Sequence, residues 1–230
     1  MKTIGLIGGL TWLSTLDYYR LLNEMVNRQL GGVEAGQIIV YSVNFGEIKV
    51  LTEAGQWDEI ARRISGVAKK LEQAGADCIL IGANTMHKIA DEVQAAVTIP
   101  VIHIAEEVAA TIEEKGLSRV ALLGTKYTMQ LDFYKNKLAA KGISTIIPNE
   151  AEIEIINNAI YTEMGKGIFT AATKAKFLGI IQRLISECAE GIILGCTEIP
   201  ILIKQEDCTV PVFDTTRIHS QAAVRFALNG

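Results

Sequence analysis

Two stretches of the chain decide the fold. They read Asp77-Cys-Ile-Leu-Ile-Gly-Ala-Asn-Thr-Met-His87 and Glu190-Gly-Ile-Ile-Leu-Gly-Cys-Thr-Glu-Ile199. Each is a short apolar run that ends in glycine and polar residues, which is typical of a buried parallel strand where it meets the next helix. When the glycines that end the two runs are aligned, Ala83 lies opposite Cys196. The repeat predicts two similar halves that face each other across a cleft, with a thiol on one wall and a methyl group on the other.

The repeat continues on both sides of these stretches. Ile4-Gly-Leu-Ile-Gly-Gly9 matches Val120-Ala-Leu-Leu-Gly-Thr125, and Ile99-Pro-Val-Ile-His103 matches Val210-Pro-Val-Phe-Asp214. We therefore predict an α/β fold of two similar domains, each a parallel sheet flanked by helices, related by a pseudo-twofold axis with the active site between them. The proline segments suggest the boundaries. Residues 1–100 with 211–230 are expected to form the first domain, and residues 101–210 the second.

Short β-branched runs alternate with longer segments that carry apolar residues at helical spacing. The predicted strands are Thr3–Ile7, Gln37–Val43, Cys78–Ile81, Val101–His103, Arg119–Leu123, Ser144–Ile147, Gly191–Leu194 and Val210–Phe213. The predicted helices are Trp12–Gln29, Trp57–Gln73, Asn84–Ala96, Thr170–Cys188 and Thr216–Leu228. In a parallel sheet, functional residues gather at the carboxyl ends of the strands, where the following helices begin.

Composition limits the classes of partner. The 230 residues are 49% hydrophobic, which suffices for a well-buried core, and the net charge is −4. Because lysine and arginine form no cluster, neither nucleic acid nor an anionic membrane is expected to bind, and a small molecule is the expected partner. A chain that enters a strand directly from Met1, without an export signal, is expected in the cytoplasm. No C-x-x-C spacing predicts zinc or a disulfide framework from the four cysteines, Cys78, Cys188, Cys196 and Cys208.

The glycine turn after the first predicted strand is the first candidate binding segment. Its backbone donors around Gly9 are open to a ligand oxygen, and Thr11, Ser14 and, after the second strand, Asn44 are the candidate contacts. The turn is not G-x-G-x-x-G and no Walker lysine follows it, so nucleotide binding is disfavoured. A purely structural interpretation, in which Thr11 or Ser14 caps the helix, is equally open.

Cys196 is the strongest single candidate. A cysteine at a strand end, followed by Thr197 and Glu198, is expected to hold its sulfur near a helix N-terminus, which would lower the thiol pKa toward neutrality. The alternative is a buried, inert cysteine, which is what we expect of Cys78 and Cys188.

The paired motifs Asn84-Thr-Met-His87 and Gly195-Cys-Thr-Glu198 resemble those of the aspartate/glutamate racemase family. The opening Gly8-Gly9 and the closing Pro211-Val-Phe-Asp-Thr215 extend the resemblance over essentially the whole chain. It is greatest to the bacterial aspartate/glutamate and broad-specificity amino-acid racemase branch. The resemblance implies a homodimeric isomerase that uses no cofactor. In such enzymes one thiolate removes the α-proton of an amino acid and an opposite thiol returns a proton to the other face.

The resemblance also implies roles for individual residues. Asn84, Thr85 and Thr197 take the positions of the donors to the substrate α-carboxylate, with Glu198 beside them, and Lys49 and Lys166 are candidates for its distal carboxylate. The chain departs from the family at Gly82 and Ala83, since neither can carry the proton of the first family cysteine. Thr85, His87 or a trapped water would have to supply that proton. No histidine pair has metal-ligand spacing, so no metal is expected.

Three other interpretations stay open. A related decarboxylase keeps one cysteine in the second half, with a small residue opposite, and protonates one face of an enediolate. A chain with a methyl group at Ala83 would also suit a protein that binds an amino acid without turning it over. The same residue would equally be found in a laboratory variant of a two-thiol enzyme whose cysteine had been replaced by alanine.

Overall fold

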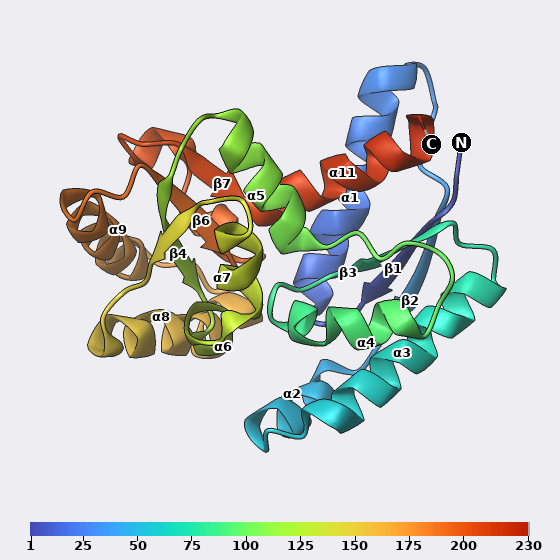
Figure 1. Cartoon of the computed structure of the whole chain (residues 1–230), viewed down its shortest axis with the longest axis horizontal. Coiled ribbons are helices and arrows are strands. Elements are labelled where there is room, and N and C mark those ends of the chain that lie inside the picture. The colour runs from blue at the N-terminus through green and yellow to red at the C-terminus, as the bar shows by residue number, and fades with distance from the viewer. Residues whose placement is uncertain (230) are drawn as a thin grey trace. The chain divides into compact units, whose positions relative to one another are not determined.

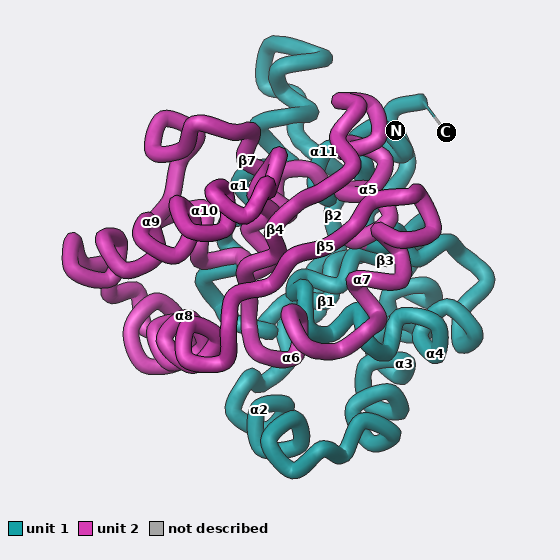
Figure 2. Tube along the Cα trace, turned by 60° about the vertical axis from the view of Figure 1, so that its left-hand side comes forward, with its two compact units in different colours: residues 1–103, 219–230 teal, residues 104–218 magenta. Residues whose placement is uncertain are grey.

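The computed structural model describes residues 1–229, which form two compact units (Figure 2). Of these residues, unit 1 contains 1–103 and 219–229, and unit 2 contains 104–218. Each unit is an α/β structure built on a parallel sheet with helices on both faces. The predicted α/β class, with two parallel sheets flanked by helices, is therefore confirmed.

The sheet of unit 1 has the strand order β2-β1-β3, and all of its pairs are parallel (Figure 1). Its strands are β1 (Ile4–Gly8), β2 (Ile38–Ser42) and β3 (Cys78–Ile81). Its helices are α1 (Trp12–Leu30), α2 (Phe45–Glu53), α3 (Trp57–Gln73), the 3-10 helix η1 (Thr85–Ile89), α4 (Ala90–Ala95) and the later part of α11 (Thr215–Asn229).

Apolar spacing decides which helix covers which face of this sheet. On α3 the residues Ile60, Ile64 and Leu71 recur at helical spacing and are buried against one face, together with Val93 of α4. The other face is covered by α1 and α11, whose buried residues pack on Ile4, Leu6 and Leu80. Since both faces are covered there, β1 and β3 are buried along their whole length.

The sheet of unit 2 has the strand order β5-β4-β6-β7, again entirely parallel. Its strands are β4 (Arg119–Gly124), β5 (Ser144–Ile146), β6 (Gly191–Gly195) and β7 (Val212–Asp214). Its helices are α5 (Ile104–Glu114), α6 (Lys126–Gln130), α7 (Asp132–Ala139), α8 (Glu150–Thr162), η2 (Met164–Lys166), α9 (Ala171–Ser186), α10 (Ile199–Leu202) and η3 (Gln205–Asp207). α8 and α9 cover one face, and α5 and α7 cover the other.

Two predicted segments differ from the structure. The expected strand Val101–His103 makes only an isolated bridge, Ile79 to Val101, so the first sheet has three strands and the second has four. The expected helix Asn84–Ala96 is divided into η1 and α4, with the break at Ile89 and Ala90.

The unit boundaries also differ from the expected ones. They lie after residues 103 and 218, not after 100 and 210. β7 stays with unit 2 because it pairs with β6 along Ile192 to Leu194. The first turn of α11 stays there too, since Thr215 donates a hydrogen bond to the Leu194 carbonyl at 2.9 Å.

Candidate active site

The turn after β1 is held by its own side chains. Gly9 has a φ of 74°, and a Cβ there would lie 2.1 Å from the Val43 carbonyl oxygen, so only glycine fits this close approach. Its N–H donates to the Thr15 hydroxyl at 2.7 Å. Thr11 is the N-cap of α1 and accepts from the Ser14 N–H at 3.2 Å. The turn is thus organised by internal hydrogen bonds, as the capping interpretation predicted.

Ser14 links this turn to the end of β3. Its side chain is buried, and its hydroxyl lies 2.9 Å from the Thr11 carbonyl and 3.1 Å from the Gly82 carbonyl. The hydroxyl proton is therefore used inside unit 1. These bonds fix the backbone just before Ala83, and the predicted contact of Ser14 with a substrate stays a prediction.

The backbone around Gly82 distinguishes the two positions, 82 and 83, at which the family resemblance places a cysteine. A Cβ at Gly82 would lie 2.9 Å from the backbone oxygen of Ile7, which is too close without a shift of the strand. Ala83 already carries a Cβ and is only half-buried, at the point where the chain leaves β3. The position that can accept a cysteine side chain is therefore 83.

The polar residues after Ala83 are buried in unit 1. Asn84, Thr85 and His87 are all at most 8% exposed. The His87 Nδ1 donates to the Ala83 carbonyl at 2.9 Å, and its ring packs against His103 with centroids 4.8 Å apart. Burial, reinforced by His103, holds the pKa of His87 well below its ordinary value. His87 is therefore neutral, which is a poor state for the proton-donating role that the sequence suggested.

A second histidine supports the same region. The His219 Nε2 lies 2.7 Å from the Ile102 carbonyl and must donate to it, so the Nδ1 accepts from the Tyr18 hydroxyl at 2.8 Å. Its ring also contacts the His87 ring, with centroids 5.3 Å apart. Burial, and to a lesser degree His87, lowers the pKa of His219 to about 3. Nothing in the sequence pattern indicated this cluster.

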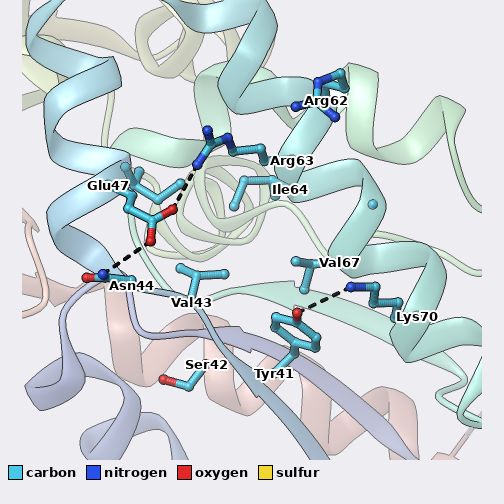
Figure 3. A pocket seen from close by; sticks show the side chains of 12 residues that line it. Tyr41, Ser42, Val43, Asn44, Glu47, Arg62, Arg63, Ile64, Val67 and Lys70 are labelled. Carbon is cyan, nitrogen blue, oxygen red and sulfur yellow. Dashed lines mark hydrogen bonds and ion pairs between the residues drawn. The ribbon is translucent and has the colours of Figure 1, made fainter.

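Asn44 caps α2 at the end of β2 and borders an open pocket of about 420 Å³ (Figure 3). Its side chain accepts from the Gly46 N–H at 3.0 Å and donates to Glu47 at 3.3 Å. Arg63 reaches Glu47 at 2.9 Å from the other side of the pocket. The charges that line this pocket are thus largely paired with one another.

The two lysines predicted for a distal carboxylate lie outside this pocket lining. Lys49 is on α2 and forms an ion pair with Glu53 at 3.3 Å. Lys166 is exposed on the 3-10 turn η2. Their predicted contacts with substrate stay predictions.

Cys196 directly follows β6 in unit 2 and is 7% exposed. Its Sγ lies 3.0 Å from Oε2 of Glu198, which is itself 2% exposed. The Thr197 hydroxyl donates to the same carboxylate oxygen at 2.7 Å. Because a carboxylate only accepts hydrogen bonds, the Cys196 thiol is the donor. Cys196, Thr197 and Glu198 therefore form one buried cluster. In it the Glu198 carboxylate accepts hydrogen bonds from both the thiol and the hydroxyl group.

This arrangement overturns the expectation of a low pKa at Cys196. Burial, followed by the Glu198 carboxylate, raises the pKa of the thiol well above its ordinary value. The helix that follows, α10, has only four residues and supplies little compensating dipole. The resting side chain is a protonated thiol beside an anion. It becomes a base only when its proton has moved to a neighbour, and Glu198 is the neighbour in hydrogen-bond contact.

Within residues 1–229, no group of three or more histidine, cysteine or acidic side chains has the geometry to hold a metal ion. None of the helices described in that range is long and apolar enough to cross a bilayer. The chemistry that these residues offer is proton transfer by the Cys196 thiol in unit 2, and buried hydroxyl and amide groups follow β3 in unit 1.

Comparison with known proteins identifies the family of the chain. The family model described as Asp/Glu/hydantoin racemase matches residues 7–223. The chain belongs to this racemase family. Racemases are isomerases, so the protein is placed in that enzyme class. The motif resemblance seen in the sequence is confirmed by this match.

Two solved structures share the fold over their full length, and one further relative matches part of the chain. A crystal structure from Yersinia pestis is 44% identical, covers 100% of both chains and superposes with a TM-score of 0.93. An aspartate racemase homologue from Pyrococcus horikoshii OT3 is 39% identical over 99% of both chains, with a TM-score of 0.86. The broad specificity amino-acid racemase RacX of Bacillus subtilis (strain 168) is 26% identical over 73% of this chain and 72% of its own.

Proposed function

We propose that this racemase acts on an amino acid, aspartate or glutamate first, without a cofactor, and that Cys196 exchanges the α-proton. The single observation that carries the proposal is the buried thiol of Cys196 in contact with the Glu198 carboxylate at 3.0 Å. A thiol beside a base, shielded from water, is the group that α-proton transfer near neutral pH requires. The relatives named for aspartate and for broad-specificity amino-acid racemisation support the substrate class.

The proton transfers of the first step follow from these contacts. The Cys196 proton moves to Glu198, which leaves a thiolate and a carboxylic acid. The thiolate then removes the α-proton of the substrate, and the electron pair of the broken C–H bond is delocalised into the substrate carboxylate. The thiol is restored and Glu198 holds the extra proton, which it returns when Cys196 is next deprotonated. Glu198 therefore serves as the proton acceptor for Cys196 and not as a substrate ligand.

Inversion also needs a proton on the opposite face of the planar carbanion. Ala83 offers no such proton, and His87 is neutral with its Nδ1 proton bound to the Ala83 carbonyl. We assign the donor role to Thr85 or to a water molecule beside the Ala83 methyl group. Because such donors are weaker acids than a thiol, return of the proton by Cys196 to the face it left should outpace inversion. The Cys196 and Glu198 protons exchange with solvent before one of them is returned, so the proposed enzyme exchanges the α-hydrogen faster than it racemises.

Binding of the α-carboxylate is assigned to short side chains and backbone donors. Asn84 and Thr85 keep the donor role that the family resemblance implies. The Thr197 hydroxyl donates a hydrogen bond to Glu198, so a substrate carboxylate has to compete with Glu198 for this donor. Lys49 and Lys166 remain the proposed contacts for a distal carboxylate. The cytoplasm remains the expected compartment.

The deciding experiment is incubation of the protein with each enantiomer of aspartate and of glutamate in deuterated water. Proton NMR follows the loss of the α-hydrogen signal, and chiral chromatography follows inversion. We expect loss of the α-hydrogen from one enantiomer with slower appearance of the other. Cys188→Ser is the matched control, since this thiol is exposed in the same unit and is not in contact with Glu198. Absence of exchange with all four substrates would contradict the proposal.

A second function, decarboxylation of a malonate-type substrate, is favoured by one specific observation. A protonated thiol whose pKa is raised by burial suits delivery of one proton to an enediolate. The two proposals separate cleanly, because only decarboxylation releases carbon dioxide from a 2-substituted malonate.

A further inference from the structure

All three histidines of the chain meet at one place in unit 1. They come from three separate segments, since His87 lies on η1, His103 directly precedes α5 and His219 lies on α11. Each is at most 7% exposed, and the rings of His103 and His219 both pack edge-on against the His87 ring, at interplanar angles of 62° and 71°. The proposed proton transfers do not pass through these rings.

The two nitrogens of His87 differ in their surroundings. Nδ1 donates to the Ala83 carbonyl at 2.9 Å, whereas Nε2 is buried and makes no hydrogen bond to any described residue. A buried acceptor without a partner lowers stability, so native proteins usually keep one for a reason other than stability. The bond to Ala83 supplies such a reason, because it fixes both the tautomer and the orientation of the ring.

The Ala83 carbonyl connects this ring to the residues that follow β3. In a trans peptide the C=O and the next N–H point in opposite directions, and the described chain has no cis peptide bond. His87 holds the Ala83 carbonyl on the side of the buried rings, so the Asn84 N–H points away from them. The preceding carbonyl, that of Gly82, is held by the Ser14 hydroxyl at 3.1 Å. Side chains of unit 1 therefore orient two successive peptides at the end of β3.

Two further side chains orient the His87 ring from behind. The His219 Nε2 donates to the Ile102 carbonyl at 2.7 Å and its Nδ1 accepts from the Tyr18 hydroxyl at 2.8 Å, so both nitrogens of this ring are engaged. Tyr18 lies on α1 and His219 on α11, the two helices that cover one face of the sheet (Figure 1). Burial lowers the pKa of His87 and of His219. A neutral ring has one donor and one acceptor, so the Tyr18 hydroxyl determines which way His219 faces.

We propose that Tyr18 and His219 are positioning residues for the reaction, which act through His87 on the peptide that joins Ala83 to Asn84. This inference rests on the proposed function, in which the residues after Ala83 supply the donors to the substrate α-carboxylate. Such donors stabilise a developing enolate only when they are held in place before the reaction begins. Tyr18 is fully buried, so it acts on the rate without touching the substrate.

Nitrogen NMR of the imidazole rings tests this geometry without any substrate. We expect the proton of His87 on Nδ1 and that of His219 on Nε2, and substitution of each histidine assigns its ring. Tyr18→Phe removes a single hydroxyl, after which His219 should lose its fixed tautomer and the His87 ring signals should shift. Tyr134→Phe is the matched control, because Tyr134 is equally buried in unit 2 and its hydroxyl makes no hydrogen bond within residues 1–229. Unchanged His87 signals in Tyr18→Phe would overturn the proposal.

Rates of α-hydrogen exchange test the effect on the reaction. Tyr18→Phe should lower kcat by about 10-fold with KM nearly unchanged, since oriented donors act mainly in the transition state. His87→Leu, which removes the donor to Ala83, should lower kcat by about 100-fold. His87→Asn should recover part of that loss, because its amide nitrogen can take the place of Nδ1. All rates are expressed per folded protein, as measured by circular dichroism.

A double-mutant cycle separates positioning from a general loss of packing. If Tyr18 acts through His87, Tyr18→Phe added to His87→Leu should lower kcat by less than about twofold further. A full second loss in the double variant would overturn the proposal, as would a Tyr18→Phe variant that is as active as Tyr134→Phe. Absence of exchange in the wild-type chain would instead contradict the proposed function, and the ring signals decide the link from Tyr18 to His87 independently of it.

Discussion

The ends of β3 and β6 share a backbone design but differ in chemistry. Each strand leads into a glycine, Gly82 or Gly195, that is tightly packed against backbone atoms. Short polar residues follow within the next few positions. After β3 the first side chain is the methyl group of Ala83, whose carbonyl accepts from a neutral, buried His87. After β6 the first side chain is the thiol of Cys196, which donates to a carboxylate.

This difference shows how little of a scaffold must change to alter its proton chemistry. At β3 every polar contact that we observe is neutral, and burial pushes histidine pKa values down. At β6 an anion is retained beside the thiol, and burial pushes the thiol pKa up. Desolvation disfavours the charged form of the side chains after both strands. A buried group can therefore transfer its proton only to a hydrogen-bonded partner, as Cys196 can to Glu198.

The largest expected effect comes from removing the thiol at β6. Cys196→Ser should lower the rate of α-hydrogen exchange by about 10³-fold or more, because a serine hydroxyl is a far weaker acid and base near neutral pH. The rate in deuterated water measures the loss, and Cys188→Ser in the same unit provides the control. Undiminished exchange in Cys196→Ser would show that the two strand ends do not differ in the way proposed.

The next effect concerns the partner of that thiol. Glu198→Gln should lower exchange by about 10²–10⁴-fold, the usual contribution of a positioned general base. Removal of the negative charge also lowers the pKa of Cys196 toward its ordinary value. The residual activity should therefore rise with pH along the titration of an isolated thiol. A purely structural role for Glu198 would instead leave the shape of the pH profile unchanged, with a loss of folded protein.

The third effect makes the two strand ends alike. Ala83→Cys should raise inversion relative to exchange by about 10²-fold, since it supplies a positioned acid on the other face. Gly82→Cys is the matched comparison, because its Cβ would lie 2.9 Å from the Ile7 oxygen. That variant should lose stability without gaining inversion. The ratio of chiral product to deuterium uptake reports both outcomes, and an unchanged ratio in folded Ala83→Cys would exclude a missing thiol as the limiting feature.

The spacing of hydrophobic residues predicted a helix or strand well wherever the pattern fits only one type of secondary structure. α3 and β3 have the bounds that the sequence predicted, Trp57–Gln73 and Cys78–Ile81, because a long amphipathic run and a short buried run are unambiguous. Hydrophobic spacing failed to predict the secondary structure where local hydrogen bonds determine it. The 3-10 turn η1 interrupts the expected helix, and the helix α8 was not predicted although its capping box, Asn149 with Glu152, is readable in the sequence.

The chemistry of the site was predicted only in part. Cys196 could be singled out because two repeats differ there, but the sign of its pKa shift depends on burial and on the fold of the next two residues. Sequence periodicity carries no information on whether Glu198 turns back toward the sulfur. The histidine cluster was equally hidden, since His87 and His219 are 132 residues apart in the chain and meet only in the folded unit.

The smallest effect tests the neutral character of the β3 side through stability. The pKa of His219 is lowered to about 3, so the unfolded chain binds a proton near pH 6.5 that the folded chain refuses. Stability is therefore complete above about pH 7 and is lost as the pH falls toward 3. Between pH 7 and pH 5, His219 alone should lower the free energy of unfolding by about 2 kcal/mol, and His87 acts in the same direction.

Urea unfolding at pH 7, 6 and 5 measures this dependence, in a range where the lowered carboxyl pKa values contribute little. His219→Gln cannot take up the proton, so its stability should fall by about 2 kcal/mol less than that of the wild-type chain between pH 7 and 5. The variant should also be less stable at pH 7, because the Tyr18 hydroxyl and the Ile102 carbonyl lose a buried partner. An identical pH dependence in both proteins would mean that His219 takes up its proton in the folded state. The β3 side would then hold charge as readily as the β6 side, and the contrast between a neutral wall and a thiol–carboxylate wall would fail.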